Sequence, residues 1–239
     1  MPAKVGVIVF PGSNCEQDAV RAISYMGGSA EYVFHDRTDV GGFDAILLPG
    51  GFAYGDYLRT GAIAAFSPVM DAVRAFANAG GPVIGICNGF QILCESGLLP
   101  GVLRRNAGLK FKCTAVHVRV ETTDCDFTSS AKLGQVLEIP INHFEGNYYC
   151  SQDVLRRLKT EDRVALRYSS PTGEVDEAYN PNGALDSIAG VLSAGRNVLG
   201  LMPHPERAVD PAVGGIDGSV ILGSLLESSM QTVSTGVVG

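Results

Sequence analysis

Short apolar runs alternate with amphipathic segments along the first part of the chain. The apolar runs are rich in β-branched residues and predict strands at residues 4–10, 30–34, 43–48 and 82–86. The amphipathic segments predict helices at residues 13–26, 67–78 and 91–96. At the start of the first helix, Ser13 and Glu16 have the spacing of a capping box, with Ser13 as the N-cap. This alternation predicts an α/β fold with a mostly parallel sheet and helices on both faces.

The pattern changes after residue 108. Residues 109–121 and 164–169 alternate apolar and polar positions, which predicts antiparallel edge strands. Residues 186–202 hold two more predicted strands, residues 218–231 predict a closing helix, and residues 232–239 are expected to be a frayed tail. We therefore expect one domain over residues 1–239, with a small antiparallel extension of the sheet.

Composition limits the function classes. The 239 residues are 46% hydrophobic and 18% charged, which is ample for one large core. The net charge of −7 argues against a nucleic-acid partner. No signal peptide and no apolar stretch near the ~20 residues of a membrane span are seen, so no membrane association is expected. Six cysteines without paired spacings fit a cytoplasmic location, and the scattered histidines predict no metal site.

The sequence Gly-Ile-Cys-Asn-Gly at residues 85–89 predicts a nucleophile elbow. Cys87 would lie on the sharp turn between a buried strand and a helix, where flanking glycines let the two elements approach closely. The partial positive charge of the helix N-terminus favours the thiolate over the thiol. The backbone N–H of Asn88 would point toward a developing oxyanion.

A base and a carboxylate follow a later apolar strand, in the sequence His-Pro-Glu. His204 and Glu206 lie in a loop at the end of that strand, which is where α/β proteins place their chemistry. In extended chain, residues two apart point the same way, so Glu206 can stay near His204. With Cys87, the three side chains are those required for acyl transfer through a thioester.

One other cysteine competes with this interpretation of Cys87. Cys15 also follows a strand and lies in the first turn of a predicted helix, so it is a rival nucleophile, although it lacks the flanking glycines. Helix packing near the site is the alternative role for Cys15. Cys94 is expected to be a small core residue.

Several sequence stretches resemble a known family. Residues 85–91 (GICNGFQ), His-Pro-Glu at 204–206 and Pro-Gly-Gly at 49–51 resemble the class I (triad) glutamine amidotransferases. Three longer stretches resemble, within that class, the small glutaminase subunits of phosphoribosylformylglycinamidine synthase, an enzyme of purine synthesis. These stretches are residues 10–15 (FPGSNC), 49–59 (PGGFAYGDYLR) and 202–207 (MPHPER). The resemblance covers nearly the whole chain and implies a flavodoxin-like fold.

The resemblance implies glutamine as the substrate. Cys87 would attack the side-chain amide, His204 would protonate the leaving ammonia, and Glu206 would orient His204. Backbone N–H groups of Asn88 and near Gly51 would hold the oxyanion, which suits a glycine-rich loop because the backbone itself must reach the ligand. Gln91 lies one helical turn after Cys87 and resembles the substrate-contacting glutamine of the family; the alternative is a polar residue on a helix surface.

The resemblance also implies partners. A synthetase subunit would use ATP and magnesium to activate the acceptor amide and would receive the ammonia, and a small bridging subunit would join the complex. The chain lacks a P-loop sequence, so we expect no ATP site and no cofactor of its own. The residues that we expect at an interface or gate are Tyr54, Arg59, His143, Glu145 and Tyr148; the alternative is that they are solvated loop residues.

One departure from the family and three other functions stay open. Residues 143–146 read His-Phe-Glu-Gly where the family commonly has His-Gly-Glu-Gly, so Phe144 puts the conformation of that turn in doubt. The other functions are a class I amidotransferase serving another acceptor, a cysteine hydrolase of similar fold, and a non-enzymatic binding protein. Loss of glutamine turnover in Cys87→Ala with the fold retained would separate an enzyme from a binding protein.

Overall fold

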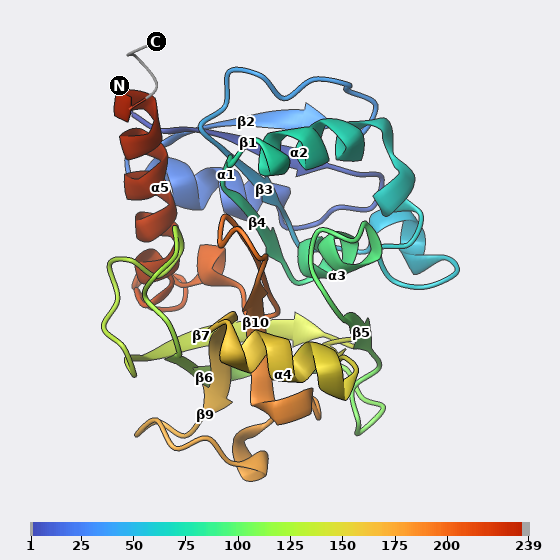
Figure 1. Ribbon diagram of the computed structural model, residues 1–239, viewed down its shortest axis with the longest axis vertical. Helices are drawn as coiled ribbons and strands as arrows, with labels where there is room; N and C mark the ends of the chain where they lie inside the picture. Colours follow the sequence, from blue (N-terminus) through green and yellow to red (C-terminus); the bar gives the residue numbers. More distant parts are fainter. Residues whose placement is uncertain (1, 236–239) are drawn as a thin grey trace.

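A nine-stranded sheet forms the centre of the protein in the computed structural model, which describes residues 2–235 (Figure 1). Its first five strands are parallel, in the order β2 (Ser29–Phe34), β1 (Lys4–Val9), β3 (Ala45–Leu48), β4 (Val83–Ile86) and β11 (Val198–Leu201). Its last four continue antiparallel as β10 (Ile188–Leu192), β9 (Val164–Ser169), β6 (Lys112–Val120) and β7 (Val136–His143). A separate two-stranded sheet pairs β5 (Val102–Arg104) with β8 (Asn147–Tyr149).

Helices cover the parallel part of the sheet on both sides (Figure 1). On one side, α1 (Glu16–Tyr25) and α5 (Gly218–Thr235) both contact the turn at residues 205–207. On the other, α2 (Pro68–Asn78) and α3 (Asn88–Glu95) both contact the turn at residues 64–66. The antiparallel part is accompanied by α4 (Gln152–Thr160).

The central strands show why the sequence folds this way. All four residues of β3 and of β4 are buried, as expected for parallel strands covered on both faces. Gly85 of β4 pairs with Leu48 of β3 and with Gly200 of β11. This register brings the carboxyl ends of three neighbouring strands together, which is where open α/β sheets bind ligands.

The sequence predicted this architecture well in its parallel half. The α/β fold class, the four early strands and the strand at residues 164–169 are confirmed. However, β6 and β9 were expected at an edge and lie inside the sheet, because β7 (a strand that the pattern did not predict) takes the edge position. The helix α4 was also missed.

Two predictions at helix ends were wrong. The N-cap of α1 is Cys15, and the hydroxyl of Ser13 instead accepts a hydrogen bond from the Phe10 N–H. Ser13 therefore closes a turn before the helix and does not form a capping box with Glu16. The closing helix was predicted to end at residue 231, but α5 continues to Thr235; residues 236–239 of the predicted frayed tail lie outside the described residues.

Among residues 2–235, no helix combines the length and apolar character that crossing a membrane requires.

Candidate active site

Cys87 occupies the corner between β4 and α3 in a strained conformation. Its backbone has φ 52° and ψ −104°, which non-glycine residues rarely adopt, and its side chain is 5% exposed. The turn is tight because Gly89 approaches the neighbouring strand: a Cβ at Gly89 would lie 2.0 Å from the Leu48 carbonyl oxygen. The sulfur atom points toward the Asn142 carbonyl, 3.6 Å away. The geometry is that of a nucleophile elbow.

His204 and Glu206 form a buried pair beside the elbow. His204 Nδ1 and Glu206 Oε1 are 2.6 Å apart, and both side chains are almost fully buried. Burial disfavours the charged imidazole, but the negative charge of Glu206 and contacts with Cys87 and Cys15 outweigh it and raise the pKa of His204 well above its usual value. Among the described residues, no atom is hydrogen-bonded to His204 Nε2. The pair can therefore hold a proton close to the Cys87 sulfur.

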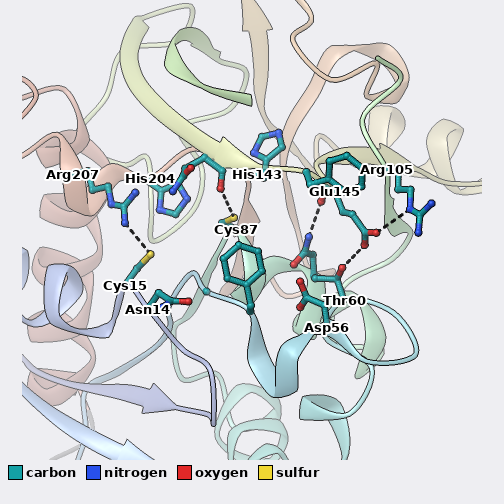
Figure 2. Close-up of a pocket in the computed structure, with 15 residues that line it drawn as sticks. Asn14, Cys15, Asp56, Thr60, Cys87, Arg105, His143, Glu145, His204 and Arg207 are labelled. Carbon is teal, nitrogen blue, oxygen red and sulfur yellow. Dashed lines mark hydrogen bonds and ion pairs between the residues drawn. The ribbon is translucent and has the colours of Figure 1, made fainter. Parts of the chain in front are cut away.

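Cys15 lies in the same site. Its side chain is buried, and Arg207 Nη2 donates to its sulfur at 3.2 Å (Figure 2). One potential metal-ligating atom from each of Cys15, His204 and Glu206 lies within 4.8 Å of the other two. However, Glu206 is already hydrogen-bonded to His204, and Cys15 is hydrogen-bonded to Arg207. Cys15 thus packs beside His204 and Cys87, which agrees with the alternative role that the sequence predicted for it, packing near the site.

Two backbone donors are free near the elbow. The Asn88 N–H lies in the first turn of α3, where helical N–H groups have no intrahelical acceptor. The Gly51 N–H makes no hydrogen bond within residues 2–235, whereas its neighbours Gly50 and Phe52 bond to the 12–15 segment. The elbow sequence predicted the Asn88 N–H as an oxyanion donor, and the family resemblance implied a second donor near Gly51.

A chain of buried side-chain hydrogen bonds fixes the loop at residues 52–53 against α3. Asn88 Oδ1 accepts from the Ala53 N–H at 3.0 Å, and Asn88 Nδ2 donates to Gln91 Oε1 at 2.9 Å. Gln91 Nε2 donates in turn to the Glu145 carbonyl at 2.6 Å. Gln91 is 4% exposed, so it is not a polar residue on a helix surface.

These elements enclose a pocket of about 330 Å³. Cys87, His204, Gly51 and Gln91 line it, as do residues that the sequence analysis did not single out as part of a site: Asn14, Asp56, Thr60, Arg105, Asn142 and Arg207. Asp56 lies within residues 49–59, one of the stretches that carry the family resemblance, and that stretch was the signal that could have indicated it. Thr60 and Arg105 carried no local signal.

The residues predicted at an interface or gate lie in different surroundings. Arg59 is 69% exposed and pairs with Glu95, with Arg59 Nε 2.7 Å from Glu95 Oε1. The hydroxyl of Tyr54 bonds to His35 Nδ1 and to the Ser67 hydroxyl. Tyr148 is fully buried and stacks on Phe90, so it presents no surface to a partner.

His143 and Glu145 lie in a turn that two buried asparagines hold. Asn106 Nδ2 donates to the His143 carbonyl, and Asn182 Nδ2 donates to the Gly146 carbonyl. His143 is 3% exposed, and burial together with the charge of His204 lowers its pKa to about 3, so it stays neutral. His143 therefore offers no interface surface, whereas Glu145 faces the pocket.

Phe144 does not distort this turn. It has no left-handed backbone angle, and its ring lies under the Arg105 guanidinium, with 5.9 Å between the guanidinium carbon and the ring centre. The bulky side chain thus lines the pocket without a left-handed backbone at its position.

Comparison with known proteins gives a consistent family. Residues 2–215 match the model of the CobB/CobQ-like glutamine amidotransferase domain. The chain is 55% identical to the phosphoribosylformylglycinamidine synthase subunit PurQ of Koribacter versatilis, covering 93% of this chain and 97% of that protein. It is 54% identical to the subunit of the same name from Rhodospirillum rubrum, covering 93% of this chain and 97% of that protein.

Solved structures agree with this assignment. A chain in the structure of PurLQS from Thermotoga maritima superposes with a TM-score of 0.85 at 42% identity, covering 95% of this chain and 99% of that one. A glutamine amidotransferase from Thermotoga maritima, at 13% identity and a TM-score of 0.55, shares the fold over 100% of this chain and 87% of its own. This chain therefore belongs to the family of glutamine amidotransferases named phosphoribosylformylglycinamidine synthase subunit PurQ.

Proposed function

We propose that this chain is the glutaminase subunit of a phosphoribosylformylglycinamidine synthase and hydrolyses glutamine through a thioester on Cys87. The observation that carries the proposal is the strained cysteine elbow, which shares one pocket with a buried histidine–glutamate pair. Backbone strain of this kind persists only where the surrounding structure enforces it, and it is concentrated at active sites.

The acylation half of the reaction uses all three side chains. The Cys87 thiolate attacks the amide carbon of the glutamine side chain, and the carbonyl oxygen becomes an oxyanion. The N–H groups of Asn88 and Gly51 are the proposed donors to that oxygen, and such a donor typically contributes about 10²–10³ in rate. His204 gives its proton to the departing nitrogen, so that ammonia leaves and a glutamyl thioester remains on Cys87.

The deacylation half restores the site. His204 takes a proton from a water molecule, and the resulting hydroxide attacks the thioester carbon. The carbon–sulfur bond then breaks, which releases glutamate and the Cys87 thiolate. Glu206 holds His204 in one orientation throughout. Its Oε1 atom is hydrogen-bonded to His204 Nδ1, and this leaves His204 Nε2 to face the Cys87 sulfur.

The proposed partners follow from the fate of the ammonia. Relatives of this chain are named as subunits of a synthase, and one solved relative is part of PurLQS. We propose a synthetase partner that uses ATP and magnesium to convert formylglycinamide ribonucleotide to the amidine, with a small bridging subunit. The chain itself carries no P-loop sequence and, in this proposal, no cofactor.

The surroundings of the pocket suit a gate that responds to the partner. Tyr54 and Arg59 lie on the loop that ends at Thr60, and the Thr60 hydroxyl donates to the Glu145 carboxylate at the pocket. Movement of this loop would change the pocket and the Gly51 donor together. We further propose that the whole chain acts as one amidotransferase domain and that it works in the cytoplasm, since its six cysteines are free thiols.

The experiment that tests the proposal measures glutamate release by the purified chain, alone and with the synthetase, bridging subunit, nucleotide and acceptor. Strong stimulation together with amidine formation would support both the glutaminase and its pathway. Equal turnover with and without the partners would point to an amidotransferase serving another acceptor. No turnover under either condition would contradict the proposal.

A further inference from the structure

The turn at residues 204–207 carries two of the three triad side chains and lies between two helices. On one side α5 packs closely, since a Cβ at Gly218 would lie 2.1 Å from the Pro205 carbonyl oxygen. On the other side the turn contacts α1, the helix that begins at the pocket. The reaction uses the histidine and the glutamate of this turn, but it gives no role to Arg207.

Arg207 joins the turn to α1 by two hydrogen bonds. Its Nε donates to Asp18 Oδ2 at 3.0 Å, and its Nη2 donates to Cys15 Sγ at 3.2 Å, the bond drawn in Figure 2. Cys15 is the N-cap of α1 and Asp18 lies in its first turn, so both acceptors belong to one end of the helix. The planar guanidinium presents its donors in a rigid fork. One side chain therefore fixes the turn to two points of α1.

Cys15 places its sulfur atom against the His204 ring. A Cβ at Gly50 would lie 2.8 Å from His204 Cε1 and 3.0 Å from Cys15 Sγ, so no further carbon atom fits where the three residues meet. The Cys15 N–H also donates to the Gly50 carbonyl, at 3.1 Å. The imidazole therefore cannot turn toward the sulfur while Arg207 holds the sulfur in place.

Glu206 depends on the turn for its own position. Its Oε1 lies 2.6 Å from His204 Nδ1, but its buried Oε2 has no hydrogen-bond partner among the described residues. A carboxylate with a single bond can swing about that bond unless its backbone is fixed, and Arg207 is the next residue in the chain. A cavity of about 50 Å³, which Asp18, Glu206 and Arg207 help to line, gives the turn room to shift if the anchor is lost.

The bonds of Arg207 suit positioning better than stability. The side chains of Arg207 and Asp18 are 29% and 32% exposed, and an ion pair that reaches solvent contributes little to the free energy of unfolding. A displacement of about 1 Å at a catalytic group, in contrast, can cost about 10²-fold in rate. Loss of this ion pair should therefore change turnover much more than it changes stability.

We propose that Arg207 and Asp18 are positioning residues for the hydrolysis of glutamine. Their ion pair anchors the turn of His204 and Glu206 to α1, and Arg207 holds the Cys15 sulfur against the imidazole. In this role neither residue touches a reacting atom, because both act through the base and the carboxylate that orients it. The inference rests on the proposed glutaminase function.

The test measures glutamate release by the assembled complex with Arg207→Lys, with Asp18→Asn and with both substitutions. Lysine keeps the positive charge but loses the fork, and asparagine keeps the size of the side chain but loses its charge. We expect each substitution to lower kcat about 10- to 100-fold and to leave KM for glutamine within about twofold. The double variant should fall no further than the lower of the two single variants, because both remove the same restraint.

The pH dependence of kcat separates positioning from a merely structural role. Burial alone would lower the pKa of His204, but the charge of Glu206 and contacts with Cys87 and Cys15 raise it above its usual value. His143 also faces His204 and stays neutral. A turn that moves away from the imidazole weakens these contacts, so the alkaline limb of kcat should shift to lower pH by about one unit. Thermal unfolding midpoints should fall by no more than about 4 °C.

Arg74 and Asp71 provide the matched control, because they form a partly exposed ion pair on α2, with 2.8 Å between Arg74 Nη1 and Asp71 Oδ1. Arg74→Lys and Asp71→Asn should change neither kcat nor its alkaline limb. Unchanged kcat, or a lower kcat with the alkaline limb in place, would overturn the proposal, and either test variant decides this if the other does not fold. Absence of glutamine turnover in the unmodified complex would instead contradict the proposed function.

Discussion

The two ends of the pocket differ in how the fold holds them. The nucleophile end comes from residues at the carboxyl ends of parallel strands, and Cys87, His204 and Glu206 are each at most 5% exposed. The second end comes from loops, and Arg105 and part of Asp56 reach solvent. The rigid end therefore suits bond-making, which tolerates little displacement, and the loop end suits recognition and response to a partner.

The largest effect should come from removing the nucleophile. Cys87→Ala should lower kcat by about 10⁴-fold or more, because no other group forms the thioester. Cys15→Ala should keep turnover within about tenfold, since Cys15 contacts His204 without lying on the elbow. Steady-state glutamate release by both variants checks this, with circular dichroism to show that each folds. A larger loss in Cys15→Ala than in Cys87→Ala would reverse the assignment.

A smaller change should displace the base at the rigid end. A Cβ at Gly50 would lie 2.8 Å from His204 Cε1 and 3.0 Å from Cys15 Sγ. We expect Gly50→Ala to lower kcat by about 10²-fold, since a shift of about 1 Å at a catalytic group has effects of that size. The control is Gly108→Ala, because a Cβ at Gly108 meets nothing within 4 Å. Equal kcat values for the two variants would show that His204 has room to move.

The loop end should respond to pH. Above about pH 6, Asp56 is ionised and can bind an ammonium group; as the pH falls through 6, it is protonated and glutamine should bind several-fold more weakly. Glu145 and Arg105 are the charged groups that share this end of the pocket. Calorimetric titration of glutamine in a Cys87→Ala background measures this without turnover. In Asp56→Asn the dependence between pH 5 and 7 should disappear, and its persistence would assign the titration to another group.

The same pKa has a consequence for stability. Because the pKa of Asp56 is higher in the folded than in the unfolded chain, its favourable contribution is present below about pH 4 and is lost as the pH rises through 6. Asp56→Asn should then be the more stable protein at pH 8, by about 1 kcal/mol after allowance for solvent screening of a half-exposed group. Denaturant unfolding would contradict this if the unmodified chain were the more stable.

The smallest effect is expected at the loop surface. Arg59→Glu replaces the pairing with Glu95 by repulsion and should reduce partner-stimulated glutaminase activity about two- to fivefold. Arg156→Glu is a suitable control, because Arg156 is 71% exposed and pairs with Asp153 on α4. If partner stimulation were equal in the two variants, Arg59 would have no part in gating.

The same contrast explains what the sequence could predict. The elbow was visible because its signal is local: a buried strand, two flanking glycines and a cysteine stand together. His204 and Glu206 were found for a similar reason, at the end of an apolar strand. The strands β3 and β4 were predicted because parallel strands that are buried on both faces are continuously apolar.

What the sequence did not predict depends on contacts between distant segments. Asn106 and Asn182 donate hydrogen bonds to the turn at residues 143–146, and Arg207 donates one to Cys15. No periodicity in the sequence connects these residues. The capping box predicted at Ser13 was wrong because the Ser13 hydroxyl accepts a hydrogen bond within the turn before the helix. Asp56 was missed as a pocket residue because two structural features mark it. Its Oδ1 has no hydrogen-bond partner among the described residues, and its backbone is strained; neither feature can be read from the amino-acid composition.

The central claim is that Cys87 attacks the substrate amide, and covalent labelling tests it most directly. The protein would be treated with a diazoketone analogue of glutamine, with and without excess glutamine, and the labelled peptide identified by mass spectrometry. We expect one label on Cys87, protection by glutamine, and loss of activity in proportion to labelling. A glutamine-protected label on Cys15, or full labelling of Cys87 with glutaminase activity retained, would contradict the account.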